Sequence, residues 1–350
     1  MGVVLVGCGR ISERHFEAIA AHPDLELRGV CDILPERAAA AGAQWRVPHF
    51  TSYDEMLDAV SADMAAICTP SGLHPRHGIM AAARGLHVVC EKPMATRLEE
   101  ADALVRACDE AGVVLFVVKQ NRLNPAVRLL KRAIDGDRFG RIYLANTTVR
   151  WQRPQSYYDM APWRGTWEFD GGAFMNQASH YVDMIQWLIG PVDAVAAKTA
   201  TLARRIETED TGVAILHFRN GALGTIEVTM LAFPRNLEGS VTVLGEHGSV
   251  KIGGTALNRV ETWEFAASDP DDDAAAALRS APDPASVYGS GHLRYYENVV
   301  RVLRGQEAPG TDGREGRKSL ELILGIYESA RLGHEVALPL RAFSAAGRSA

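Results

Sequence analysis

The chain has 350 residues, of which 23% are charged, and a formal net charge of −6 at pH 7, so it is long enough for two domains with separate cores. The charge balance, without any dense basic stretch, excludes nucleic acid as an expected partner. No apolar segment approaches the length of a membrane span and the N-terminus does not resemble a signal peptide, so we expect a cytoplasmic protein that does not contact a membrane.

The chain opens on an apolar run, Val3 to Val6, which predicts a buried strand, and a helical pattern begins near Ser12. Between them, Gly7 permits a tight turn and Gly9 lets the backbone approach a pyrophosphate, as in the dinucleotide-binding fingerprint. The third fingerprint position is Ser12 instead of glycine or alanine. The helix start would offer N–H groups and a positive dipole end to the phosphates. The alternative interpretation is a tight turn in an ordinary α/β protein.

An acidic residue follows the second predicted strand, which spans residues 25–30. Asp32 stands where the ribose of the adenosine would lie in a dinucleotide-binding domain. A carboxylate there accepts hydrogen bonds from the ribose hydroxyls and repels a 2′-phosphate. The sequence therefore favours NAD over NADP as the cofactor.

Strands and helices alternate over residues 1–119, which predicts right-handed βαβ units on a parallel sheet and an N-terminal Rossmann domain that binds NAD. Two helices begin with sequences that have the form of capping boxes, Ser52-Tyr-Asp-Glu55 and Thr96-Arg-Leu-Glu99. The later predicted strands are 64–68, 86–90 and 113–118, and the predicted helices are 12–21, 35–42, 52–60, 74–84 and 96–111.

Beyond Lys119 this alternation ends, and residues 120–350 are predicted to form a C-terminal α+β domain for substrate binding and oligomerisation. Turns such as Arg219-Asn-Gly221 separate successive strands, which predicts antiparallel hairpins in a large, mostly antiparallel sheet with helices on one face. The predicted strands are 142–151, 192–201, 211–219, 223–230, 239–244 and 248–252, and the predicted helices are 124–135, 173–188, 292–303 and 318–332.

Two features of this second domain bear on its surroundings. The outer face of the sheet needs a cover, which a second copy of the chain would provide, so we expect a homo-oligomer; a solvated face is the alternative. Residues 268–286, with three aspartates, an alanine run and three prolines, are typical of a mobile excursion.

Three further motifs accompany the fingerprint: Thr69-Pro-Ser-Gly-Leu-His-Pro75, Glu91-Lys-Pro93 and Gly171-Gly-Ala-Phe-Met-Asn-Gln-Ala-Ser-His180. The first two follow predicted strands at the carboxyl edge of the sheet, where open α/β sheets bind ligands. With these motifs, nearly the whole sequence resembles the glucose–fructose oxidoreductase, inositol dehydrogenase and rhizopine-catabolism (Gfo/Idh/MocA) family of sugar oxidoreductases.

A closer resemblance is to the bacterial UDP-N-acetyl-2-amino-2-deoxyglucuronate (UDP-GlcNAcA) 3-dehydrogenases. It is carried by Lys119-Gln-Asn-Arg-Leu-Asn-Pro125, Trp163-Arg-Gly-Thr-Trp-Glu-Phe169 and Met175-Asn-Gln-Ala-Ser-His-Tyr-Val-Asp183. It implies NAD-dependent oxidation of the C3′ hydroxyl of UDP-GlcNAcA to a 3-keto sugar, in the biosynthesis of lipopolysaccharide O-antigen, by an oligomer that is favoured to be a tetramer. It leaves open whether NADH is re-oxidised in place by 2-oxoglutarate.

Two alternatives are another sugar or inositol dehydrogenase of the same family and a non-catalytic regulator that binds NAD. The presence of Lys92 and His180 argues against the regulator, because a sensor needs no proton acceptor. We expect no metal: His74 and His77 have a spacing that could bind one, but no third ligand is evident and hydride transfer needs none.

The resemblance assigns catalytic roles to two residues. Lys92 hydrogen-bonds the reacting hydroxyl and stabilises developing alkoxide character, and His180 accepts the hydroxyl proton because imidazole titrates near neutral pH. Four residues before His180 the family commonly has an aspartate, whereas this chain has Asn176, which suits an anionic uronate. That departure leaves open which of Lys92 and His180 is the principal base. Asp183 either orients His180 or is a charge on the helix surface.

The same resemblance implies two sets of binding residues. Lys119, Arg122 and Arg164 are candidates for binding the substrate carboxylate or diphosphate, since guanidinium groups fit both, but each could equally belong to a structural ion pair. Tyr157 and Tyr158 either stack on uracil or pack the loop. The cofactor-binding residues are expected to be Gly7, Gly9, Arg10, Ile11, Asp32, Thr69, Pro70, His74, Glu91 and Lys92. The substrate-binding residues are expected to be Lys92, Lys119, Arg122, Tyr157, Arg164, Asn176 and His180.

Overall fold

The computed structural model describes residues 1–282 and 291–340. The chain divides into two compact units. The first comprises Met1–Leu123, Glu168–Asp170 and Ser290–Arg317, and the second comprises the remaining segments, Asn124–Trp167, Gly171–Gly289 and Lys318–Ala350. The sequence analysis assigned the whole of 120–350 to the second domain and did not anticipate that a later segment rejoins the first. No helix among the described residues is long and apolar enough to cross a membrane.

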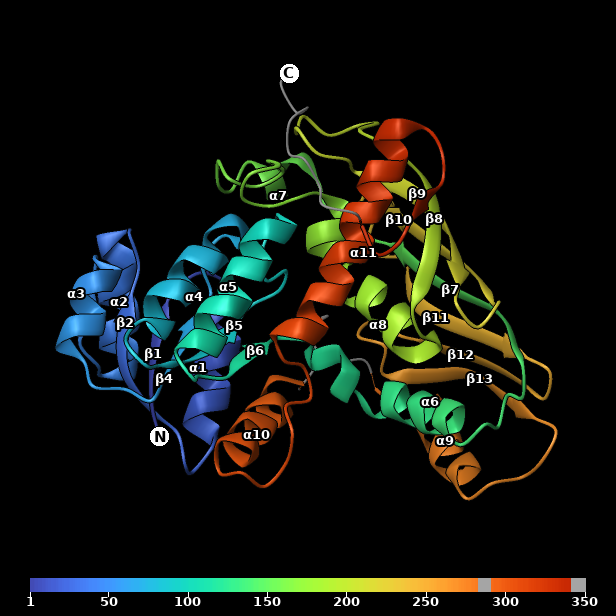
Figure 1. Cartoon of the computed structure of the whole chain (residues 1–350), viewed down its shortest axis with the longest axis horizontal. Helices are drawn as coiled ribbons and strands as arrows, with labels where there is room; N and C mark the ends of the chain where they lie inside the picture. The colour runs from blue at the N-terminus through green and yellow to red at the C-terminus, as the bar shows by residue number, and fades with distance from the viewer. Residues whose placement is uncertain (283–290, 341–350) are drawn as a thin grey trace. The chain divides into compact units, whose positions relative to one another are not determined.

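The first unit contains a six-stranded parallel sheet in the order β3-β2-β1-β4-β5-β6, which confirms the predicted Rossmann architecture (Figure 1). The chain order reverses between β1 and β4, and ligands of such sheets bind beyond the carboxyl ends of the strands at that point. The strands are β1 (Gly2–Val6), β2 (Glu26–Cys31), β3 (His49–Phe50), β4 (Met64–Ile67), β5 (His87–Cys90) and β6 (Leu115–Val117).

Helices surround this sheet, and α10 returns from the C-terminal part of the chain to lie beside α1 (Figure 1). Tyr295 and Tyr296 of α10 enter the same buried cluster as Phe16 and Ile19 of α1. The helices of the unit are α1 (Ser12–Ala21), α2 (Pro35–Trp45), α3 (Tyr53–Ala59), α4 (His74–Ala82), α5 (Leu98–Glu110) and α10 (Gly291–Leu303), with the short 3₁₀ helices η1 (Ser71–Leu73) and η2 (Gln120–Leu123).

The N-cap hydrogen bond of one predicted capping box is present, and that of the other is not. The Ser52 hydroxyl oxygen accepts from the backbone N–H of Glu55 at 3.3 Å, at the start of α3. At α5, however, the N-cap is Arg97 and no side chain caps the helix. The Thr96 hydroxyl instead donates to the Glu168 carbonyl at 3.2 Å. The hydroxyl that the local sequence assigns to the helix cap therefore bonds to a residue distant in the sequence.

The second unit contains an eight-stranded mixed sheet in the order β13-β12-β11-β7-β10-β9-β8-β14. Only the β10–β7 pair is parallel among the described strands of this sheet, and the predicted hairpins β9–β10 and β11–β12 are present. The strands are β7 (Ile142–Arg150), β8 (Val192–Ala200), β9 (Thr211–Phe218), β10 (Leu223–Thr229), β11 (Glu238–Gly245), β12 (Gly248–Gly253), β13 (Arg259–Phe265) and β14 (Val336–Ala337).

Burial alternates along the strands of this sheet, so one face is covered and the other is open. On β9, Ala214 and Leu216 are buried while Val213 and Ile215 are exposed. Helix α8 packs against β7, and α6 packs against β12 and α8 (Figure 1). The helical segments are α6 (Pro125–Asp135), α7 (Gln155–Tyr158), the π-helix η3 (Ala173–Gln177), α8 (Ser179–Ile189), α9 (Asp271–Arg279) and α11 (Gly313–Leu332), which begins in the first unit.

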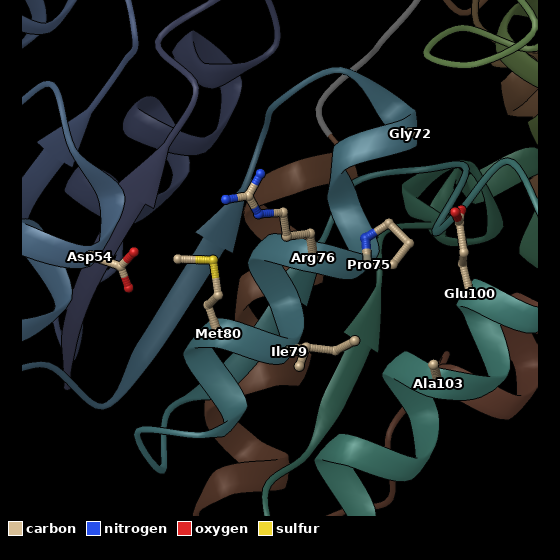
Figure 2. A pocket seen from close by; sticks show the side chains of 8 residues that line it. All are labelled: Asp54, Gly72, Pro75, Arg76, Ile79, Met80, Glu100 and Ala103. Carbon is tan, nitrogen blue, oxygen red and sulfur yellow. The ribbon is translucent and has the colours of Figure 1, made fainter.

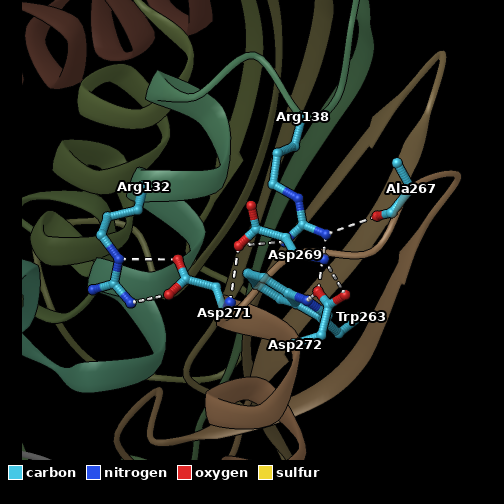
Figure 3. Close-up of polar contacts among 7 residues, drawn as sticks. All are labelled: Arg132, Arg138, Trp263, Ala267, Asp269, Asp271 and Asp272. Carbon is cyan, nitrogen blue, oxygen red and sulfur yellow. Dashed lines mark hydrogen bonds and ion pairs between the residues drawn. The ribbon is translucent and has the colours of Figure 1, made fainter.

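The expectation that residues 268–286 form a mobile excursion is wrong for the part that the structure describes; residues 283–286 lie outside it. Aspartates at the start of α9 favour a helix, because their negative charges are attracted to the positive end of its dipole. Arg132 donates to both carboxylate oxygens of Asp271 at 3.0 and 2.8 Å, and Arg138 donates to Asp272 at 2.9 Å (Figure 3). These pairs attach α9 to the α6 region.

Candidate active site

The turn after β1 has the shape that a dinucleotide requires. Gly7 has a φ of +94°, and a Cβ atom on it would lie 2.6–2.7 Å from the backbone of Cys68 and Thr69. A Cβ on Gly9 would meet nothing within 4 Å, so the backbone there is open to a ligand. The glycines thus serve the two purposes expected of them, tight packing against β4 and free approach from outside.

Asp32 braces this turn from the end of β2. Its side chain is buried, with Oδ2 accepting from the N–H of Cys8 at 2.8 Å and Oδ1 accepting from the N–H of Leu34 at 2.9 Å. Arg10 is exposed, and Ile11 is the N-cap of α1 without any side-chain cap hydrogen bond. The first N–H groups of α1 are therefore not capped by a side chain, as an anion-binding helix start requires.

The motif after β4 is linked to the motif after β5 through one histidine. His74 is 1% exposed; its Nε2 lies 2.7 Å from the Thr69 carbonyl oxygen and its Nδ1 lies 2.7 Å from the Pro93 carbonyl oxygen. The Thr69 hydroxyl contacts Nδ1 of His77 at 3.0 Å, and Pro70 is half-buried. Both nitrogens of the His74 ring thus contact backbone. Its expected contact with the cofactor stays a prediction.

Glu91 holds the backbone of the neighbouring lysine. It is 3% exposed, and its Oε2 accepts from the Lys92 N–H at 3.0 Å. Burial opposes the charged carboxylate, but His15 and His292 outweigh it and hold the pKa of Glu91 well below its usual range. Lys92 is half-buried, and the Lys92–Pro93 peptide bond is cis.

His15, Glu91 and His292 also form the one group of possible metal ligands that the described residues contain, with ligand atoms within 4.8 Å of one another. Hydrogen bonding accounts for the contacts of His15. Its Nε2 lies 3.0 Å from Glu91 Oε1, and its Nδ1 lies 2.8 Å from the Tyr296 hydroxyl. We therefore interpret the cluster as a buried hydrogen-bond network, and the expectation of no metal stays a prediction.

Lys119 and Arg122 lie at the end of the first unit, next to or within η2. They are 3% and 7% exposed. Arg122 Nη1 lies 3.2 Å from Glu315 Oε2. This pair favours the structural role among the two that the sequence left open for Arg122.

In the second unit, the predicted helix 173–188 is divided in two. The N–H of Ala178 donates to the carbonyl of Ala173 at 2.8 Å, five residues earlier, so η3 is a π-helix and α8 begins after it. Asn176 lies in η3 and His180 lies in the first turn of α8, so the two are not related by one regular α-helical turn. Asp183 is 2% exposed, so the alternative of a surface charge is wrong.

The start of η3 is held by a buried carboxyl group that the sequence analysis missed. Glu209 is 3% exposed, and its Oε1 accepts from the Phe174 N–H and from the Tyr327 hydroxyl, both at 2.9 Å. Burial raises the pKa of Glu209 to about 7. The signal in the sequence was Gly172, where a Cβ would lie 2.0 Å from Glu209 Oε2. Gly172 makes room for this carboxyl group, whereas a Cβ on Gly171 would meet Met175.

A cationic and aromatic cluster lies in the loop before η3. The Arg164 guanidinium lies 4.3 Å from the centroid of the Tyr157 ring and 4.7 Å from that of Trp163. Arg164 Nε is buried and has no hydrogen-bond partner among the described residues. Gln177 donates to the Tyr157 hydroxyl at 2.9 Å, which connects the cluster to η3. Tyr158 is buried against the edge of Tyr157 and therefore packs the loop.

A cavity of about 560 Å³ in the first unit lies elsewhere (Figure 2). Its charged lining residues are Asp54, Arg76 and Glu100, from α3, α4 and α5. Gly72 and Pro75 of the motif after β4 line it, but none of the residues expected to bind cofactor or substrate does. The candidate cofactor residues of the first unit therefore lie at the strand ends and not in this cavity.

Two family models match the chain. Residues 1–119 match the oxidoreductase family model for a NAD-binding Rossmann fold of the Gfo/Idh/MocA type, and residues 131–338 match the model for its C-terminal α/β domain. Among curated relatives, the chain is 27% identical to a D-apiose dehydrogenase of Paraburkholderia graminis, over 95% of this chain and 88% of the relative.

Solved structures give higher identity. The chain is 56% identical to the WlbA dehydrogenase from Bordetella pertussis, crystallised with NADH and UDP-GlcNAcA, with a TM-score of 0.94 over 97% of this chain and 98% of the other. It is 53% identical to the WlbA dehydrogenase from Chromobacterium violaceum, also in complex with NADH and UDP-GlcNAcA, with a TM-score of 0.93 over 97% of this chain and 96% of the other.

Proposed function

Since the chain belongs to the Gfo/Idh/MocA oxidoreductase family, we propose that it is an NAD-dependent dehydrogenase that oxidises the C3′ hydroxyl of UDP-GlcNAcA to a ketone. The observation that carries this function is the identity of 56% and 53%, over 97% of the chain, with two dehydrogenases whose crystals hold NADH and UDP-GlcNAcA. A match over 97% of the chain includes most of both units.

The residues around the β1 turn fit the cofactor. Gly7 and Gly9 would admit the pyrophosphate, the first N–H groups of α1 would bind it, and Asp32 would accept from the ribose hydroxyls. When bound, NAD⁺ supplies the acceptor for the hydride that leaves the sugar carbon. The Asp32 carboxylate would repel a 2′-phosphate, which favours NAD over NADP.

In the proposed reaction, the C3′–H bond breaks and its electron pair leaves as hydride, while the C3′ hydroxyl loses its proton and a C=O bond forms. The Lys92 ammonium donates to the reacting oxygen and stabilises the negative charge that develops there. His180 accepts the proton, since a histidine can be neutral at the pH of the reaction.

The second unit supplies groups that suit an anionic sugar nucleotide. Asn176 is a neutral amide that can hydrogen-bond sugar hydroxyls without repelling a uronate. Arg164, stacked on Tyr157, would bind the carboxylate or the diphosphate, because a planar guanidinium presents paired donors to either. Lys119 and Arg122 are weaker candidates, since Arg122 already contacts Glu315.

The assembly that we propose is a homo-oligomer formed through the open face of the second unit's sheet. That face exposes large apolar side chains on four adjacent strands, and such surfaces usually mark protein interfaces. They are Leu144 of β7, Leu223 of β10, Val213 and Ile215 of β9, and Leu244 of β11. Light scattering should give a multiple of the monomer mass, and the Ile215→Asp substitution should reduce it; a monomer in both cases would contradict this assembly.

The function is tested by the appearance of NADH when the enzyme is mixed with NAD⁺ and a panel of substrates. UDP-GlcNAcA should give a kcat/KM at least about 10²-fold above that for D-apiose or myo-inositol, because the nucleotide and the carboxylate contribute binding energy that the free sugars lack. Turnover of the free sugars without turnover of UDP-GlcNAcA would instead identify another sugar dehydrogenase. Binding of NAD⁺ without turnover of any substrate would favour the regulator.

A further inference from the structure

His74 occupies an unusual position for a histidine that is removed from solvent. It is 1% exposed at the start of α4, and it bridges the two motif-bearing loops at the carboxyl ends of β4 and β5. Both ring nitrogens lie 2.7 Å from a backbone carbonyl oxygen, Nε2 from Thr69 and Nδ1 from Pro93. The second of these carbonyls belongs to the residue that follows Lys92.

The two contacts determine how many protons the ring carries. A carbonyl oxygen can only accept, and a neutral imidazole has one N–H group and one nitrogen lone pair. A neutral His74 would therefore direct a lone pair at a carbonyl oxygen only 2.7 Å away, in a place where water cannot intervene. An imidazolium donates from both nitrogens and satisfies both carbonyls, and such charge-assisted bonds are short.

We propose that His74 is held as an imidazolium and acts as a positioning residue: its two N–H groups join the Thr69 and Pro93 carbonyls and thereby fix the turn that presents Lys92. The importance of that turn rests on the proposed function, because it depends on Lys92 contacting the substrate. The charge on His74 does not rest on it.

The charged groups around the ring act in opposite directions. Burial is the largest influence and, with the Lys92 ammonium, leaves the pKa of His74 lowered on balance, although the two carbonyls and the buried Glu91 carboxylate favour the charged ring. The hydrogen-bond geometry favours the charged ring over the neutral one, since only an imidazolium can donate to both carbonyl oxygens. His77, on the next turn of α4, has its pKa lowered to about 4 by burial and by the charge on His74, so it stays neutral and adds no second charge.

His15 provides a contrast within the same unit. It is 0% exposed. Its Nε2 lies 3.0 Å from the Glu91 carboxylate, and its Nδ1 lies 2.8 Å from the Tyr296 hydroxyl. A hydroxyl can donate as well as accept, so a neutral His15 satisfies both contacts. Two equally buried histidines therefore differ in what faces them: one faces a possible donor, and the other faces acceptors alone.

Nitrogen NMR tests the charge directly. The chain has 11 histidines, and in protein labelled with ¹⁵N at the histidine rings, the signals lost in His74→Gln identify this ring. At neutral pH, both lost nitrogens should have shifts of the protonated type. One protonated and one unprotonated nitrogen would overturn the proposal. His15→Gln supplies the comparison ring, and His74→Asn identifies the signals if His74→Gln does not fold.

Kinetics test the positioning. His74→Gln can donate to only one of the two carbonyls, so kcat with UDP-GlcNAcA should fall about 10- to 100-fold while KM changes less than about threefold, as expected when a catalytic group is misplaced. His87→Gln, at the opposite end of β5, is the matched control and should keep the wild-type kcat. An unchanged kcat in His74→Gln, with wild-type turnover intact, would overturn the positioning role. No turnover in the wild type would instead contradict the proposed function and leave the NMR result standing.

Discussion

The turn that carries Lys92 and the segment that carries Asn176 are both held by a buried titratable side chain, but the two side chains have opposite hydrogen-bonding character. At the Lys92 turn, the His74 ring contacts two backbone carbonyl oxygens. At the start of η3, Glu209 accepts from the Phe174 N–H. One side chain donates to the backbone and the other accepts from it.

The difference follows from the direction of the backbone in each place. Loops at the carboxyl ends of parallel strands contain carbonyl groups that no strand partner satisfies, whereas the first residues of a helix have N–H groups without partners. A buried donor suits the first situation and a buried acceptor suits the second. Local backbone polarity thus selects the residue type that holds each catalytic segment, and the predictions below test the two arrangements in turn.

The largest effect is expected when the groups that these segments present are removed. Lys92→Met and His180→Gln should each lower kcat at least about 10²-fold, or about 3 kcal/mol, because stabilisation of the alkoxide and acceptance of its proton are both lost. Steady-state formation of NADH measures this. The matched control is Lys251→Met. Lys251 lies on β12 and pairs with Glu238 and Glu261, so this variant should keep the wild-type kcat. Wild-type turnover in both Lys92→Met and His180→Gln would refute the catalytic assignment.

The next effect concerns stability and its dependence on pH. Burial raises the pKa of Glu209 from 4.5 to about 7, so the folded state binds this proton more tightly than the unfolded state does. Stability from this group is therefore fully present below pH 4.5 and is lost as pH rises to about 7, at a cost of about 3 kcal/mol at most.

Glu209→Gln should remove that dependence, because an amide carries no titrating proton. From pH 5 to pH 7, roughly the interval in which Glu209 ionises, the free energy of unfolding of the variant should rise relative to that of the wild type. Denaturant unfolding at several pH values measures it. Glu227→Gln, on the open face of the sheet and 41% exposed, is the control, and a parallel trend in both variants would contradict the assignment to Glu209.

A smaller effect is expected at the cofactor. Asp32→Asn keeps one acceptor for the backbone N–H groups of the turn but loses the charge that disfavours a 2′-phosphate. The KM for NAD⁺ should rise about tenfold, or about 1.4 kcal/mol, and the preference for NAD⁺ over NADP⁺ should shrink. Kinetics with both cofactors test this, and an unchanged preference would show that Asp32 does not read the ribose.

The smallest effect is expected far from both catalytic segments. Arg132→Met breaks the paired contact with Asp271, and because Arg132 is 55% exposed, the loss should be less than about 1 kcal/mol. Thermal unfolding should show a slightly lower Tm with kcat unchanged. A large loss of stability would mean that α9 contributes more to the second unit than its exposed ion pairs suggest.

The sequence was most informative where local pattern and tertiary role agree. The alternation of strands and helices, the Gly7 turn and the hairpin at Arg219-Asn-Gly221 all follow from short-range physics, and the structure has them. It was misleading where a partner distant in the sequence determines the local structure. Thr96 donates to the Glu168 carbonyl instead of capping its helix. Arg132 and Arg138 bind α9, in a stretch whose composition suggested mobility.

The buried groups that hold the catalytic segments were the least predictable part of the site. Glu209 precedes a strand with no motif of its own, and only its close approach reveals why a glycine stands at position 172. The π-helical turn was hidden as well, because the apolar pattern of residues 173–188 is compatible with one continuous α-helix. The Glu209 carboxyl accepts from Phe174, 35 positions away in the chain, and periodicity does not encode such a contact.

The most direct test of the account follows the hydrogen atom that the enzyme is proposed to remove. UDP-GlcNAcA carrying deuterium at C3′ is incubated with the enzyme and NAD⁺, and the nicotinamide product is analysed by mass spectrometry and NMR. The account predicts that the deuterium appears at C4 of NADH and that the sugar becomes a 3-keto compound. NADH formed without deuterium, while the label remains at C3′ of the sugar, would contradict it.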